Sequence, residues 1–194
     1  MTEAGLRERS KARRRAAIIR AAFELFAERG YDATTVADIA EAAEVSPRTV
    51  SMYFPAKQDI AMSRLTDGVA GLTAAIQDRR PGETVHDVFG RWLLSAQAGP
   101  GDREMHRLAR RMFAANPDLA ALRTARVAAA IREGAALIAE EDGTAPDAIA
   151  PRIAAAAAAA VANEIIDTEP GPERQDAVAA AMRFLEAGTA AIRS

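Results

Sequence analysis

The sequence predicts an all-α fold in two parts, a three-helix helix-turn-helix domain at the N-terminus and a larger helical domain after it. Apolar residues recur at helical spacing between Gly and Pro breaks, with few strand-like runs. Two short helix signals joined by a tight turn lie within residues 35–57. The 194 residues are enough for a second core after this first domain.

The chain opens with a basic segment, residues 1–12, which we expect to be a disordered arm because charge runs at chain ends are usually solvated. Its charge could equally contact DNA phosphates.

The helix-turn-helix domain is predicted over residues 13–60. Its first helix is indicated by apolar residues at helical spacing, namely Ile18, Ala21, Ala22, Leu25 and Phe26. Gly30 ends it, since glycine readily forms a left-handed helix cap.

The second helix is predicted to begin after Thr35, whose side chain can cap it. Asp38 follows three residues later, as in a capping box. One face of this helix is apolar and should be buried, comprising Val36, Ile39, Ala40 and Ala43.

The third helix is predicted to begin at Pro47, because Ser46 can cap it and proline is tolerated at the first helical position. The short connection contains the apolar Val45, so the two helices should form a rigid pair. Val50 and Phe54 share the inward face of the third helix. The residues left for the outer surface are Arg48, Thr49, Ser51, Met52 and Tyr53. This is the layout of a helix-turn-helix that reads double-stranded DNA.

The segment FAERGYDATTVADIAEAAEVSPRTVSMYFPAKQDI carries a family resemblance. It resembles the N-terminal domain of TetR-type transcriptional regulators, over roughly residues 13–62. The matching positions are Phe26, Gly30, Thr35, Ile39, Ala40, Val45, Ser46, Thr49, Tyr53, Phe54 and Lys57. Two positions depart from the family pattern: Glu44 replaces a usual turn glycine, and Ser51 replaces a common aromatic residue.

The resemblance implies that Thr35 meets a phosphate, while Pro47, Arg48 and Met52 approach base edges. Arg48 also suits guanine on chemical grounds, because a guanidinium can hold its two major-groove acceptors. The candidate DNA-binding residues are Thr35, Ser46, Pro47, Arg48, Thr49, Met52, Tyr53 and Lys57. Thr49, Tyr53 and Lys57 suit phosphates. Alternatively, Arg48 is a solvated surface residue and Tyr53 packs its ring in the core.

Residues 61–194 are predicted to form an effector-sensing and dimerisation domain. Breaks fall at residues 80–82, 99–101, 116–117, 142–143 and 170–172. No Pro or other strong breaker interrupts the segment from Ala56 to Ile76, so we expect one continuous helix linking the two domains. A ligand that tilted this helix could move the DNA-reading helices out of register.

Aromatic and methionine side chains suggest an apolar effector pocket, since such sites combine apolar walls with a few polar groups. The candidates are His86, Phe89, Trp92, Met105, His106, Met112 and Phe113. The alternative is an ordinary core. No metal site is expected, because two histidines without cysteines lack metal-ligand spacing.

The last two predicted helices, near residues 146–168 and 172–192, are rich in alanine. Small side chains allow close helix packing, and the resemblance implies that the two C-terminal helices of each subunit form a four-helix homodimer interface. The candidate interface residues are Ile153, Val161, Ile165, Val178, Met182 and Leu185. Alanine-rich composition alone could also explain the tract.

The sequence therefore predicts a DNA-binding regulator, most simply a dimeric repressor on a palindromic operator that a small apolar effector releases. One alternative is a dimeric regulator whose second domain only dimerises or binds a protein partner. A remote alternative is a small helical enzyme with His86 or His106 as base, but no catalytic motif or cofactor site is evident. The absence of cysteines excludes disulfides and redox sensing by thiols. Without a hydrophobic signal core or a membrane-length apolar stretch, a soluble cytoplasmic protein that contacts no membrane is expected.

Overall fold

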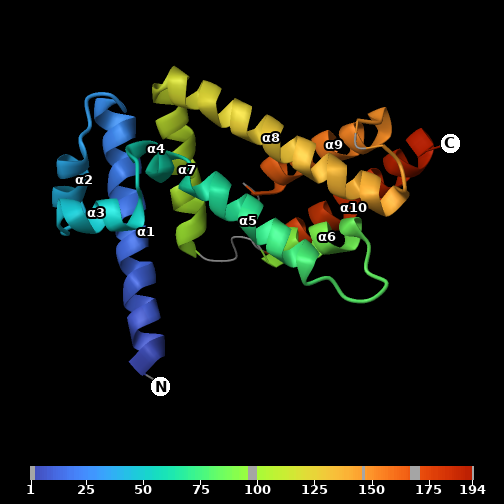
Figure 1. Cartoon of the computed structure of the whole chain (residues 1–194), viewed down its shortest axis with the longest axis horizontal. Helices are drawn as coiled ribbons and strands as arrows, with labels where there is room; N and C mark the ends of the chain where they lie inside the picture. Colours follow the sequence, from blue (N-terminus) through green and yellow to red (C-terminus); the bar gives the residue numbers. More distant parts are fainter. Residues whose placement is uncertain (1–2, 96–99, 146, 167–170, 194) are drawn as a thin grey trace. The chain divides into compact units, whose positions relative to one another are not determined.

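The computed structural model describes residues 3–95, 100–145, 147–166 and 171–193, and every regular element in these ranges is a helix (Figure 1). The all-α fold class is therefore confirmed. The helices are α1 (Glu3–Arg29), α2 (Val36–Ala42), α3 (Pro47–Tyr53), α4 (Lys57–Ala61), α5 (Ser63–Gln77), α6 (Val85–Ser95), α7 (Pro100–Ala115), α8 (Pro117–Asp142), α9 (Ile149–Ile166) and α10 (Pro172–Arg193). The predicted breaks separate these helices, although residues 99 and 170 lie outside the described ranges.

The chain forms two compact units, which are described separately here. Unit 1 spans Met1–Thr66 and Glu104–Arg123, and unit 2 spans Asp67–Arg103 and Thr124–Ser194. Unit 1 therefore also includes most of α7 and the start of α8, whereas the predicted division at residue 61 placed these residues in the second domain. Each crossing between the units falls within a helix, in α5, α7 and α8.

Unit 1 has one hydrophobic core, built by helices from both of its segments. Phe23 and Phe26 of α1, Ile39 of α2 and Val50 of α3 are almost completely buried in it. The second segment contributes Met105, Leu108, Ala109, Met112 and Leu119. These residues belong to the same buried cluster as Ile39 of α2 and Val50 of α3, so α7 and the start of α8 contribute to the core of unit 1.

The basic N-terminal segment is helical, which corrects the expectation of a disordered arm. Helix α1 begins at Glu3, and residues 1 and 2 lie outside the described part of the chain. Arg and Ala are strong helix formers, and Arg14 donates from Nη2 to Ser10 Oγ one turn earlier, at 2.9 Å. Figure 1 shows this end of α1 extending beyond α3. Its basic side chains from Arg7 to Arg14 are exposed, Arg15 is half-buried, and the buried face begins at Ile18.

The expected continuous helix from Ala56 is interrupted at Met62. Here α4 ends and α5 begins, and Met62 has φ −94° and ψ −1°, away from regular helical values. The Met62 side chain is fully buried in the core of unit 1. The junction is therefore marked by a buried side chain and not by a Pro or Gly residue. The one continuous helix predicted from the sequence is two helices, α4 and α5.

Unit 2 is built around α6, α9 and α10, which pack against one another. Its main core contains Phe89, Leu93, Ile165, Val178 and Leu185. Helix α6 comes close to α10 at Gly90, where a Cβ atom would lie 3.1 Å from Met182 Cγ. The side chain of Arg174, at the start of α10, is buried and donates to Leu93 O at 2.7 Å.

Candidate DNA-binding site

The start of α2 is fixed by a reciprocal cap, as the sequence predicts. The Asp38 backbone N–H donates to Thr35 Oγ1 at 3.1 Å, and the Thr35 N–H donates to Asp38 Oδ2 at 2.7 Å. The Thr35 hydroxyl also donates to the same carboxylate oxygen. These hydrogen bonds hold the pKa of Asp38 below its usual value. Thr35, which is predicted to contact a phosphate, is exposed, but its hydroxyl is already hydrogen-bonded within the helix cap.

The turn between α2 and α3 requires a left-handed residue, and Glu44 supplies it with φ +54°. This is the position at which the related family usually has glycine, and the conformation explains that preference. Val45 packs against the core of unit 1. Its amide donates to Ala40 O at 2.9 Å, so the turn is held by both packing and hydrogen bonding.

Helix α3 begins with the predicted cap and buries the predicted face. The Thr49 N–H donates to Ser46 Oγ at 3.1 Å, and Pro47 occupies the first turn. Val50 and Phe54 are buried, and the Arg15 guanidinium lies 5.2 Å from the centre of the Phe54 ring. Helix α1 thus supports the inner side of α3 through both core packing and a cation–π contact.

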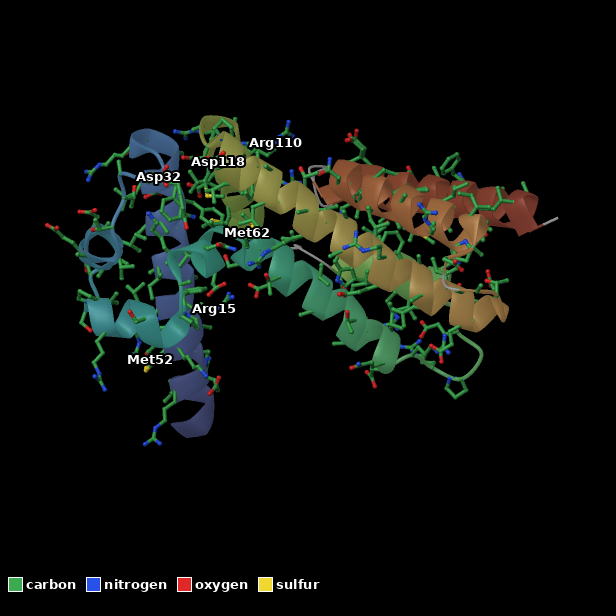
Figure 2. All side chains as sticks on the ribbon, turned by 45° about the horizontal axis from the view of Figure 1, so that its top comes forward. Arg15, Asp32, Met52, Met62, Arg110 and Asp118 are labelled. Atoms are coloured by element: carbon green, nitrogen blue, oxygen red, sulfur yellow. The ribbon has the colours of Figure 1, made fainter. Side chains whose placement is uncertain are left out.

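The outer surface of α3 carries the residues best placed for a DNA groove. Arg48, Ser51 and Met52 are exposed, and Met52 retains 71% of its surface. Figure 2 shows Met52 projecting from the edge of α3. Thr49 and Tyr53 are half-buried. The Tyr53 ring packs against the core, as the alternative interpretation of that residue proposes.

Lys57 does not have the free ammonium expected of a phosphate-contacting residue. Its Nζ donates to Tyr31 O at 2.6 Å and to Thr34 O at 2.8 Å. It also lies 4.1 Å from the centre of the Tyr31 ring. Lys57 therefore ties the start of α4 to the loop between α1 and α2, and its assignment to a phosphate stays a prediction.

Asn116 is a structural residue of unit 1 that the sequence analysis overlooked. Its Nδ2 donates to Phe26 O at 2.8 Å and Met112 O at 2.7 Å, while its Oδ1 accepts the Tyr31 N–H at 2.7 Å. The turn between α7 and α8 is thereby bonded to the end of α1. The Asn-Pro pair indicates a turn in the sequence, but no neighbouring residue indicates which groups the Asn116 side chain will bond.

The predicted effector residues fall in two different units. Phe89 and Trp92 stack in unit 2, with ring centres 5.8 Å apart. His86, also in unit 2, is half-buried and lies 3.3 Å from Thr189 Oγ1 through Nε2. The other four candidates, Met105, His106, Met112 and Phe113, belong to unit 1. Of these, Met105 and Met112 are buried in the core of unit 1, as the ordinary-core alternative proposes.

The predicted dimer residues also divide by burial. Ile165, Val178 and Leu185 are at most 5% exposed in the core of unit 2, so they are unavailable to a partner. Val161 and Met182 pack partly against the same core, whereas Ile153 is 46% exposed. Phe184 of α10, which is not among the predicted interface residues, is 65% exposed. Its position on the outer surface distinguishes it from the buried apolar residues of the same helix.

The described residues contain no group of three or more His, Asp or Glu side chains that could hold a metal ion. Within the same part of the chain, no helix is both long and apolar enough to cross a membrane.

Two capped helices, a tight turn and an exposed polar face on α3 define a helix-turn-helix DNA-binding protein. The sequence model described as "Bacterial regulatory proteins, tetR family" matches residues 18–62, and that of the "MftR C-terminal domain" matches residues 81–190. The chain therefore belongs to the TetR family. It is a DNA-binding transcriptional regulator and not an enzyme.

Among individual relatives, the HTH-type transcriptional regulator TcmR of Streptomyces glaucescens is 43% identical over 79 residues. This match covers 41% of the present chain and 35% of TcmR, so it spans about a third of that relative.

Solved structures share the whole fold at lower identity. Salmonella enterica GusR is 20% identical with a TM-score of 0.62, covering 91% of this chain and 95% of GusR. NalD of Pseudomonas aeruginosa, the secondary repressor of the MexAB-OprM multidrug efflux pump, is 18% identical with a TM-score of 0.58. That comparison covers 89% of this chain and 96% of NalD.

Proposed function

We propose that this protein is a dimeric repressor that recognises a palindromic operator through the exposed face of α3. The observation that carries the proposal is the combination of a rigidly capped α3 with Arg48 and Met52 on its solvent side. Arg48 is free to enter a major groove and contact guanine. A bidentate contact of this kind contributes about 1–3 kcal/mol of discrimination between bases.

The N-terminal part of α1 supplies a second contact in this proposal. The residues Arg7, Arg9, Lys11, Arg13 and Arg14 are exposed on a helix that supports α3 through Arg15. Phosphate neutralisation by such residues adds affinity without reading sequence, and it makes binding depend on salt. We assign these side chains to the DNA backbone beside the groove that α3 enters.

Dimerisation is assigned to α9 and α10, which expose apolar side chains in unit 2. Ile149 and Ile153 of α9 are 65% and 46% exposed, and Phe184 and Ile192 of α10 are 65% and 37% exposed. Pairing this surface with a second copy would remove the apolar area from water. Two copies related by a two-fold axis would present two α3 helices to half-sites about 34–36 Å apart, or a multiple of this distance.

The effector is assigned to unit 2, near the stacked Phe89 and Trp92, with His86 as a nearby polar group. An apolar ligand fits this composition. The competing function is a second domain that only dimerises or binds a protein. Thermal denaturation with a panel of apolar compounds separates the two, since a ligand that binds the native state raises its melting temperature. An effector that weakens operator binding must itself bind the operator complex more weakly by the same factor, because coupling between two sites is reciprocal.

Selection of random duplexes by the purified full-length protein tests operator recognition. We expect an enriched palindrome that binds about 10³-fold or more tightly than a scrambled duplex at near-physiological salt. Arg48→Ala should flatten the preference for the selected sequence over a variant with its conserved guanine changed. Weak, salt-sensitive binding without enrichment would contradict sequence-specific regulation.

A further inference from the structure

Met52 is an apolar side chain in an unusually exposed position. At 71% exposure it is the most exposed of the large hydrophobic residues in the described chain. It lies on α3, whose opposite face is fixed in the core through Val50. Met52 makes no contribution to that core, so its exposure suggests that it contacts another molecule.

Arg48 and Met52 lie four residues apart on α3 and therefore share one face of the helix. Four residues advance a helix by about 6 Å, which corresponds to roughly two base-pair steps of 3.4 Å. A helix presenting this face to a major groove would place a guanidinium and a thioether over neighbouring base pairs. The cation suits guanine, whereas the thioether has no polar hydrogen to donate.

Among the unmodified base pairs, the apolar group on the floor of the major groove is the C5-methyl of thymine. A methionine side chain is long, flexible and polarisable, so it can adapt its shape to a methyl group. We infer that Met52 is a specificity-determining residue that packs against the C5-methyl of a thymine within about three base pairs of the guanine contacted by Arg48. This inference rests on the proposed recognition of an operator by α3.

Uracil substitution tests the contact directly, because dU differs from dT only by loss of the methyl group. Each dT of the selected operator is replaced in turn by dU, symmetrically in both half-sites, and duplex affinity is measured. Burial of one methyl-sized group contributes about 0.8 kcal/mol, so one position should lose about fourfold in affinity per half-site contact. Met52→Ala should bind the dT and dU duplexes equally at that position.

Two further substitutions test the chemistry of the side chain. Met52→Leu should retain the preference for dT, whereas Met52→Gln, which has a polar end, should lose it. Ser51→Ala is the matched control, because Ser51 is an exposed neighbour of Met52 on α3 and its short hydroxyl side chain has no long apolar end to pack against a methyl group. It should keep the preference. Since Met52 is outside the core, equal melting temperatures of the variants would show that the fold is unchanged.

The outcomes separate this inference from the proposed function. If an operator is selected but no dU position is sensitive, or if the sensitivity persists in Met52→Ala, thymine reading by Met52 is wrong while operator recognition stands. If no sequence is selected at all, both are wrong.

Discussion

Glu44 adopts a left-handed backbone conformation that is unfavourable for residues with a Cβ atom. Glu44→Gly should therefore stabilise unit 1, although glycine's greater freedom in the unfolded chain offsets part of the gain. We expect the free energy of unfolding to rise by about 0.5–1 kcal/mol, measured by urea denaturation. Glu44→Ala keeps the Cβ and serves as the control, with no comparable gain expected. A loss of stability in Glu44→Gly would show that the strain is relieved elsewhere.

Asp38 makes the stability of the α2 cap depend on pH. Its folded-state pKa is lowered, chiefly by the Thr35 hydrogen bonds, so the stabilisation is present above the unfolded pKa of about 3.9 and is lost as pH falls through the lower folded value. Asp38→Asn should be less stable than the wild type at neutral pH. The difference should shrink below about pH 4, in denaturation curves recorded at several pH values. A difference that stays constant with pH would exclude this carboxylate as its source.

Residues whose partners are close in sequence could be predicted from the sequence. Thr35, Asp38 and Ser46 have cap partners three residues away, and these contacts are confirmed. Lys57 and Asn116 could not be assigned in this way, since Lys57 bonds across 26 residues and Asn116 across 85 to reach Tyr31. Their residue types fit solvent as well as a buried network, and only the folded chain distinguishes the two.

At the scale of helices, Tyr31 joins three elements of unit 1. Its N–H bonds to Asn116 after α7, and its C=O bonds to Lys57 at the start of α4. Its ring also meets Phe26 of α1 edge to face, with centres 5.1 Å apart. The loop between α1 and α2 is therefore positioned from two sides, and the support of α3 depends on helices distant in the sequence.

Asn116→Ala should destabilise unit 1 strongly, because it leaves the Tyr31 N–H and the Phe26 carbonyl without this partner in a buried site. Loss of about 2–3 kcal/mol is expected in chemical denaturation. Asp118→Ala, at an exposed position in the first turn of α8, provides the control and should change stability by less than about 0.5 kcal/mol. Similar small effects in both variants would show that the Asn116 network contributes little.

Lys57→Met distinguishes the structural role of this lysine from the predicted phosphate contact. We expect a loss of about 1–3 kcal/mol in stability, because two hydrogen bonds from a charged donor and a cation–π contact are removed. The slope of log affinity against log salt should stay unchanged in binding titrations with the selected operator. A slope smaller by about 0.9 for each lysine would instead indicate that Lys57 neutralises a phosphate in the complex.

The helix boundaries show which elements can be predicted from local signals. Pro47, Pro117 and Pro172 each begin a helix, and Gly30, Gly82 and Gly143 adopt positive φ values at or between helix ends. The junction at Met62 has no such residue, and it was missed. The sequence also did not predict that most of α7 belongs to unit 1. The buried residues of α7 recur at helical spacing, and this spacing does not show which core they join.

At the scale of the whole molecule, the same ambiguity affects the association of subunits. Ile165 and Ile153 both lie at apolar positions of α9, but one is buried in the protomer and the other is exposed. A sequence pattern identifies an apolar face without identifying what covers it. The apolar residues of α9 and α10 that remain exposed on the protomer are the ones available to a partner, and Phe184 is a large aromatic member of this set.

Phe184→Glu should convert the proposed dimer into a monomer, because it would bury an unpaired charge in the interface. Sedimentation velocity measures the change in mass. Phe184→Leu should remain dimeric, and Leu94→Glu, at a 47% exposed position on α6, should also leave the dimer intact. The protomer should remain folded in all three variants, because each substituted position is largely outside the core. Circular dichroism spectra can check that the helical content is unchanged.

Operator binding gives this last prediction a second, independent measurement. A Phe184→Glu monomer carries one α3 and one basic α1 segment, so it should engage a single half-site with about half the phosphate contacts of the dimer. Its salt slope should fall to about half the wild-type value, and the two half-sites should bind independently. A variant that remains dimeric would place the interface elsewhere, whereas a monomer with an unchanged salt slope would show that one subunit makes all the phosphate contacts.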